Sequence, residues 1–163
     1  KNFDYNGGLA KIGKVNELVF NQAVDNFSNF SYNKSLDIKD YDISFAKGLS
    51  LEDGCATITK FTAYLIAEGL KMINDQDNLF SKINILCGGG RKNISLIKNL
   101  KYFLSHNEIE FKNIDEYELD GDYIESQAFA YLAIRSYLKL PISFPGTTGC
   151  KEPTIGGVIV KNF

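Results

Sequence analysis

Apolar residues recur at three- and four-residue spacings in several stretches of the chain, and each such stretch predicts a helix. The most regular one runs from Ser50 to about Ile73, where Ser50, followed three positions later by Asp53, resembles a capping box. A shorter amphipathic pattern covers Val15–Val24, and another covers residues 93–105. We therefore expect one long helix and two shorter ones in the first two thirds of the chain.

Short apolar runs between these helices predict strands. Ile83–Cys87 has the length of a buried strand, residues 109–111 suit a second, and the Val-Ile-Val run within Ile155–Val160 favours a third. The glycine-rich residues 4–13 and the Asn- and Ser-rich residues 26–39 predict loops. Because the strands alternate with helices, we expect an α/β fold, and nothing in the composition marks a second domain.

An acidic segment at residues 115–122 leads into a further helix, which Pro141 ends. Apolar residues occupy much of the surface of this helix, so we expect most of it to be buried, with Phe129 and Tyr131 in the core. Asp122 lies just before the helix, where a carboxylate is favoured as an N-cap.

Three consecutive glycines stand between the strand predicted at Ile83–Cys87 and the helix that follows it. Gly88, Gly89 and Gly90 have no side chain to hold a ligand away, and the start of a helix offers unpaired N–H groups to anionic groups. Asn93 suits the N-cap of that helix. The pattern therefore favours a nucleotide-binding turn, and the alternative is an ordinary strand-to-helix turn.

Two known phosphate-binding motifs fit the glycine turn poorly. A dinucleotide fingerprint needs a third glycine where Asn93 stands, although Glu110 lies near the position of the acid that holds a ribose. A Walker sequence needs a Gly-Lys-Ser/Thr ending, which is missing after Gly90. A dinucleotide-dependent enzyme thus remains only a weak alternative.

Composition and charge narrow the function classes. The chain has 163 residues, with 18 basic and 20 acidic residues giving a formal charge of −2, and no block of like charge predicts nucleic acid or an anionic membrane as a partner. Three widely spaced cysteines argue against a disulfide framework or a zinc site and favour a reducing cytoplasm. The apolar runs are too short to span a bilayer, no signal peptide is evident, and a start without methionine indicates a processed, cut or incomplete chain.

Several segments together resemble the C-terminal half of the anhydro-N-acetylmuramic acid kinase family. These segments are Asp4–Val15, Asp53–Thr59, Leu86–Gly90 with Asn93, Glu125–Ala133, Thr148–Gly149 and Gly156–Ile159. They occur in the family's order and spacing, and they cover nearly the whole chain.

The resemblance implies an actin-like ATPase lobe of the ribonuclease H-like kind, with a mixed sheet and flanking helices. Residues 1–163 would form the C-terminal nucleotide-binding lobe of a two-lobe sugar kinase, whose N-terminal lobe is absent from this chain. The implied reaction uses ATP and Mg²⁺ to hydrolyse the anhydro ring of 1,6-anhydro-N-acetylmuramic acid and to phosphorylate O6. It yields N-acetylmuramate 6-phosphate in cytoplasmic peptidoglycan recycling, and the family tendency implies a homodimer.

The resemblance also implies roles for single residues. Nucleotide contacts are expected from Gly88, Gly89, Gly90 and Asn93. Glu125 is expected to face the cleft between lobes and to bind a sugar hydroxyl or order the site, and the alternative is a carboxylate stabilised by the helix dipole. Asp4 and Gly7 are expected to shape a loop that lines the cleft, and the alternative is simple turn formation. Arg91 and Lys92 are expected to be solvated charges, with contact to a phosphate as the alternative.

The chain departs from the family pattern in two respects. Lys34 and Ser35 stand in a family loop whose Gly and Arg are missing here. The family's first phosphate loop and catalytic aspartate belong to the N-terminal half, so no catalytic base or metal ligand is assigned to any residue present. The alternative to an active kinase is a catalytically incompetent nucleotide-binding module or a split-gene remnant.

Overall fold

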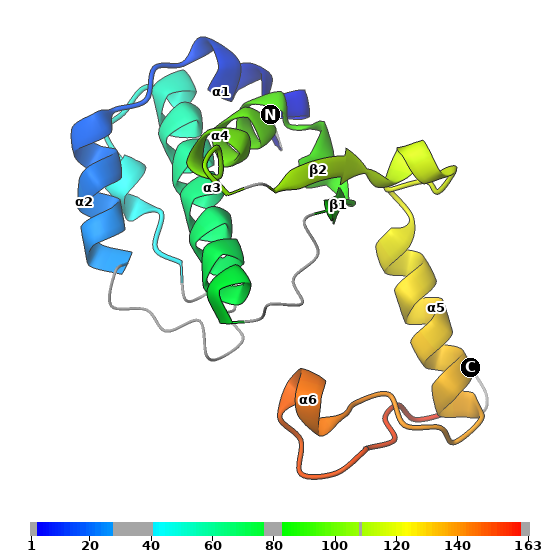
Figure 1. Cartoon of the computed structure of the whole chain (residues 1–163). Helices are drawn as coiled ribbons and strands as arrows, with labels where there is room; N and C mark the ends of the chain where they lie inside the picture. The colour runs from blue at the N-terminus through cyan, green and yellow to red at the C-terminus, as the bar shows by residue number, and fades with distance from the viewer. Residues whose placement is uncertain (1–2, 28–40, 77–82, 108, 161–163) are drawn as a thin grey trace.

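The computed structural model describes residues 3–27, 41–76, 83–107 and 109–160 (Figure 1). Their α-helices and strands are α1 (Gly8–Ile12), α2 (Glu17–Phe27), α3 (Leu51–Gln76), β1 (Ile83–Leu86), α4 (Ile94–Phe103), β2 (Glu110–Asn113), α5 (Ile124–Tyr137) and α6 (Pro145–Thr148). Single 3₁₀ turns are η1 (Tyr5–Gly7), η3 (Ser44–Ala46), η4 (Gly89–Lys92) and η5 (Ile114–Tyr117). The α/β class is confirmed.

Helix α3 is the centre of the folded body, with α2 on one side and α4 on the other (Figure 1). Ala63 and Ala67 lie four residues apart on α3 and are 0% exposed, so they allow α4 to approach closely. Leu100 and Leu104 of the α4 segment pack into this contact. A second cluster joins α2 to α3 through apolar side chains that include Phe20, Phe27, Phe61 and Leu65.

The start of α3 is fixed by polar contacts. The Asp53 N–H donates to Ser50 Oγ at 3.1 Å, which confirms the predicted cap. Thr57 is 0% exposed, and its hydroxyl accepts from the Asn16 N–H at 3.0 Å while donating to the Asp53 carbonyl at 2.7 Å. Asp53 Oδ1 also accepts from the Lys14 N–H at 2.7 Å, which holds the pKa of the Asp53 carboxyl below its ordinary value. These contacts join α3 to the segment between α1 and α2.

Strands β1 and β2 are parallel, with Ile83 opposite Glu110 and Leu86 opposite Asn113, and α4 is the crossover between them. The strand expected at Ile83–Cys87 is thus present, but it is not buried, because Ile83 and Ile85 are 41% and 49% exposed. The two strands form the whole sheet within the described residues. The mixed sheet remains a prediction.

Helix α5 contradicts the expected burial most clearly. It projects away from α1–α4, toward the C-terminal segment that carries α6 (Figure 1). Phe129 and Tyr131, expected in the core, are 65% and 58% exposed. The helix is rich in apolar residues, as the sequence indicates. However, the rest of the described chain does not cover its outer side.

Two other expectations are corrected. Residues 4–13 are not an irregular loop, because they fold into η1 and α1 around the Asp4 carboxylate, which accepts from the N–H groups of Leu9 at 2.7 Å and Ala10 at 3.0 Å. Ile155–Val160 forms no strand, and Val158 is 90% exposed. An isolated antiparallel bridge between Ser143 and Thr154 lies just before this segment. Most of the predicted loop at 26–39 lies outside the described residues.

Candidate functional site

The glycine turn lies open at the carboxyl end of β1. Gly88 has φ 71° and ψ 177°, a conformation that favours glycine, and its N–H donates to the Gly121 carbonyl at 2.8 Å. A Cβ added at Gly88 or Gly89 would meet no atom within 4 Å. The turn therefore presents bare backbone to open space, and no neighbouring side chain fills it.

A cavity of about 310 Å³ lies beside this turn, between it and the N-terminal segment of the chain. Its lining residues are Phe3, Asp4, Tyr5, Asn6, Gly89, Lys92, Asn93 and Asp122. The cavity thus brings together Asp4 of the N-terminal segment with Gly89 and Asn93 from the middle of the sequence, three of the residues expected at the site. Glu125 is not among the residues that line it.

Asn93 has the predicted structural role as well as a place in the cavity wall. Its Oδ1 accepts from the Leu96 N–H at 3.0 Å, which makes it the N-cap of α4. Gly7, at φ 70°, is buried directly against the Asn93 side chain, and an added Cβ would overlap the Asn93 amide. Gly7 therefore supports one wall of the cavity by close packing and does not line it.

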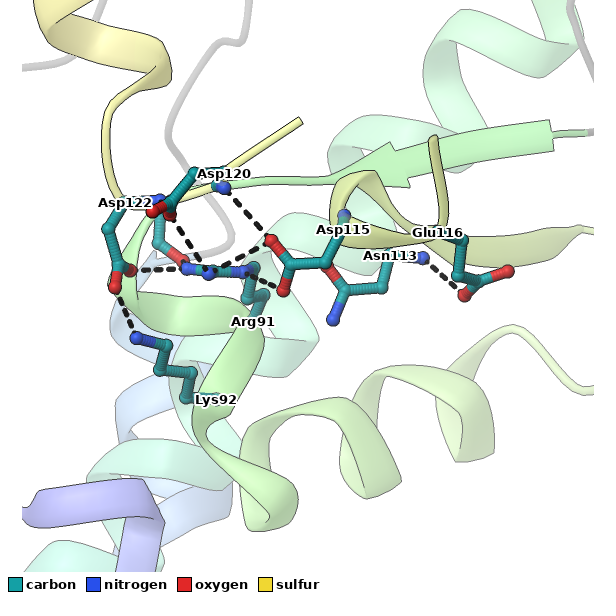
Figure 2. A network of polar contacts seen from close by, with 9 residues as sticks. Arg91, Lys92, Asn113, Asp115, Glu116, Asp120 and Asp122 are labelled. Atoms are coloured by element: carbon teal, nitrogen blue, oxygen red, sulfur yellow. Dashed lines mark hydrogen bonds and ion pairs between the residues drawn. The ribbon is translucent and has the colours of Figure 1, made fainter. Parts of the chain in front are cut away.

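Arg91 is the centre of a polar cluster that holds the glycine turn in place (Figure 2). Its Nε and Nη2 donate to the two oxygens of Asp115 at 3.0 and 3.1 Å, and its Nη1 donates to Asp122 at 2.5 Å. Nη1 also donates to the Gly88 carbonyl at 3.0 Å. Only 4% of the Arg91 side chain is exposed, because Gly121 leaves room for it: a Cβ at Gly121 would lie 2.5 Å from Arg91 Nε.

This cluster corrects two expectations. Arg91 is neither a solvated charge nor a group free to reach a phosphate, since its guanidinium is held by two carboxylates and a carbonyl. Asp122 is not a helix cap, because it pairs with Arg91 and Lys92, and the N-cap of α5 is Tyr123, with no side-chain cap bond. The signal in the sequence is only general: an arginine directly after the glycine turn, and an acidic segment further along the chain at residues 115–122.

The cluster also shifts acid–base equilibria. Hydrogen bonds from Arg91 are the main cause that lowers the pKa of both Asp115 and Asp122 below the ordinary value. The Gly121 N–H adds to the effect at Asp115, and Lys92 adds to it at Asp122. The same contacts raise the pKa of Arg91, so the guanidinium stays charged.

Replacing Arg91 with alanine is expected to lower the unfolding midpoint by more than replacing Lys92, because Arg91 is enclosed whereas the Lys92 side chain is 46% exposed. The lowered aspartate pKa values also set a pH window. The stability from this cluster is complete above the unfolded aspartate pKa and is lost as pH falls below about 4. Urea unfolding of the natural chain, R91A and K92A at pH 7 and pH 3 measures both effects. Equal losses between pH 7 and pH 3 in all three proteins would contradict this prediction.

The remaining sequence-predicted residues lie elsewhere. Glu125 is exposed in the first turn of α5, and its contact with a sugar remains a prediction. Lys34 and Ser35 lie outside the described residues. Gly90 follows Gly89 in η4, and a Cβ there would meet Leu96 at 3.7 Å, so Gly90 faces the protein and not the open side of the turn.

The described residues contain neither a metal-binding cluster nor a membrane-spanning helix. No three His, Cys, Asp or Glu side chains gather there in a way that could hold a metal ion, so no metal ligand is assigned. None of the helices described combines the length and the apolar character needed to cross a bilayer.

Comparison with known proteins decides the family. The sequence profile of the family described as "Anhydro-N-acetylmuramic acid kinase" matches residues 1–162. The chain belongs to the anhydro-N-acetylmuramic acid kinase family. The glycine turn and its cavity are therefore features of a chain from a sugar kinase family.

Curated proteins of the anhydro-N-acetylmuramic acid kinase family match nearly all of this chain. A kinase of that name from Pelagibacter ubique is 55% identical over 99% of the chain, and one from Zymomonas mobilis is 39% identical over 96%. A third, from Caulobacter vibrioides, is 38% identical over 97%. The chain spans only 43%, 41% and 41% of the lengths of these relatives.

Proposed function

We propose that this chain is the nucleotide-binding lobe of an ATP-dependent kinase of 1,6-anhydro-N-acetylmuramic acid. The reaction opens the anhydro ring by hydrolysis and phosphorylates O6, giving N-acetylmuramate 6-phosphate in cytoplasmic peptidoglycan recycling. The observation that supports this proposal is the cavity beside Gly89 and Asn93, in a chain that belongs to this kinase family.

The proposed architecture is the C-terminal lobe of an actin-like kinase. The N-terminal lobe, in the same polypeptide or in a separate one, would supply the catalytic base and the first phosphate loop, and the complete enzyme would form a homodimer. The relatives' greater length supports this division, because more than half of each relative lies beyond the part that this chain matches.

The residues present fit a nucleotide better than they fit a metal. The open side of Gly88 and Gly89 accepts the adenosine and ribose against bare backbone. The Oδ1 of Asn93 is committed to Leu96, so its Nδ2 is the group that would donate to the nucleotide. Lys92 is paired with Asp122 at the cavity wall, and a phosphate that reaches Lys92 would compete with that carboxylate. Mg²⁺ bound with ATP supplies positive charge against the phosphates.

Titration and turnover test the proposal separately. Isothermal titration of ADP into the 163-residue chain is expected to show binding at one site, which NAD does not displace. A chimera of the Pelagibacter ubique relative, with its matched segment replaced by this chain, is expected to phosphorylate 1,6-anhydro-N-acetylmuramic acid. Binding without product in the chimera would favour the incompetent nucleotide-binding module, and binding of NAD without binding of ADP would favour a dinucleotide enzyme.

A further inference from the structure

Helix α5 carries an uncharged stripe along its whole length. The stripe follows the spacing i, i+3, i+4, i+7, i+8 and i+11, which places its members on one face of the helix. Its members are Ser126, Phe129, Ala130, Ala133, Ile134 and Tyr137. This spacing is typical of a helix that lays one face against another element, and small residues at its centre allow a close approach.

The described chain leaves this stripe bare. All of its members are exposed, and the large side chains Phe129, Ile134 and Tyr137 are 65%, 58% and 70% exposed. The half-buried residues of α5 include Leu132 and Arg135, on the opposite side of the helix.

The opposite side of α5 contacts the C-terminal segment. Arg135 Nε donates to the Pro141 carbonyl at 2.7 Å on that side, and Ser136, at the edge of the stripe, also approaches the C-terminal segment, because a Cβ at Gly157 would lie 3.2 Å from Ser136 Oγ. One side of α5 is therefore packed, and the other is an apolar surface that requires a partner.

We propose that the stripe on α5 docks the part of a family-length kinase that this chain does not span, the N-terminal lobe of the arrangement proposed above. The relatives are matched over 43% of their length or less, so each carries a further body of protein larger than this chain. A helix with apolar residues on nearly all sides is an element of a protein interior, and such a body supplies the missing half of that interior.

A second copy of this chain fits the same surface less well. Uncharged exposed residues extend beyond the stripe to Tyr131 and Leu138, 58% and 56% exposed, so exposed uncharged residues, most of them apolar, cover more than half of the circumference of α5. One partner helix covers a stripe about 100° wide, and the flanks of α5 would stay exposed in a two-helix contact. A surrounding lobe covers the stripe and both flanks.

Hydrogen exchange tests whether the missing lobe covers α5. Backbone amides of α5 are compared in the 163-residue chain and in the Pelagibacter chimera described above. Exchange in α5 is expected to be about 100-fold slower in the chimera, while the amides of α3, already packed in the chain alone, change little. Equal exchange of α5 in the two proteins would overturn the proposal.

A pair of substitutions identifies the face that docks. Phe129→Asp lies in the stripe, and Leu18→Asp replaces a residue that is 80% exposed on α2 and serves as the matched control. Phe129→Asp is expected to lower the thermal midpoint of the chimera by about 5 °C or more and to leave that of the 163-residue chain nearly unchanged. Leu18→Asp is expected to leave both unchanged, and equal effects of the two substitutions in the chimera would overturn the proposal.

Three further outcomes are also decisive. If the 163-residue chain sediments as a dimer that Phe129→Asp dissociates, a second copy occupies the stripe and the proposal fails. Protection of α5 in a chimera without kinase activity supports docking while contradicting the proposed function. Kinase activity in a chimera whose α5 amides are not protected supports the proposed function while contradicting docking.

Discussion

Replacing Gly13 with alanine is expected to lower the free energy of unfolding by about 3 kcal/mol. Gly13 ends α1 at the point where that helix meets the first turn of α3, and an added Cβ would overlap the Glu52 carbonyl and lie 2.9 Å from the Asp53 nitrogen. These are backbone atoms of a helix, so they cannot turn aside as a flexible side chain can. Relief requires that α1 move away from α3, which breaks the Lys14–Asp53 hydrogen bond.

Urea unfolding followed by circular dichroism measures this loss, and Gly8→Ala is the matched control. Gly8 belongs to the same short helix at φ −64°, and its added Cβ would approach only Asp4 Oδ1, at 3.9 Å. That substitution is expected to stabilise the chain by about 0.5–1 kcal/mol, because alanine restricts the unfolded backbone without strain. A Gly13→Ala variant as stable as Gly8→Ala would show that α1 and α3 are not packed as described.

Replacing Gly89 with valine is expected to weaken ADP binding by about 100-fold or more. A Cβ at Gly89 meets no protein atom within 4 Å, and Gly89 lines the cavity beside Asn93, so the valine side chain enters the cavity that is proposed to hold the nucleotide and leaves the protein undisturbed. The expected result is therefore a folded chain with an almost unchanged thermal midpoint and little affinity for the nucleotide.

Gly146→Val is the control for this experiment. Gly146 also meets no atom within 4 Å, but it lies in α6, far along the chain from the glycine turn. Isothermal titration of ADP into both variants, with circular dichroism melting of each, separates loss of the ligand from loss of the fold. Full affinity in a folded Gly89→Val variant would remove the glycine turn from the proposed nucleotide site.

Helix caps and helices can be predicted from the sequence because the residues that form each contact lie close together along the chain. The Ser50 cap, the Asn93 cap and the long α3 all depend on contacts within a few residues, and the structure confirms each of them. The glycine turn was recognised for a similar reason, since a strand, three glycines and a helix are consecutive.

Features that depend on distant residues were missed. Arg91 meets Asp115 and Asp122 from 24 and 31 residues away, and nothing in the local spacing indicates that these charges converge on one buried guanidinium. The apolar composition of α5 predicts burial. It indicates that the helix favours contact with other apolar residues, but it does not show whether the described chain provides those contacts. A sequence pattern cannot distinguish a partner within the described chain from one outside it.

The narrow space at Gly121 has a mechanical consequence. Its carbonyl accepts from the Gly88 N–H, its own N–H donates to Asp115, and its missing side chain makes room for Arg91, only three residues before α5 begins. These contacts restrict the direction in which α5 leaves the glycine turn. In the two-lobe kinase proposed above, a preoriented α5 would lose less orientational entropy when the lobes assemble, so part of the required ordering would already be present at this junction.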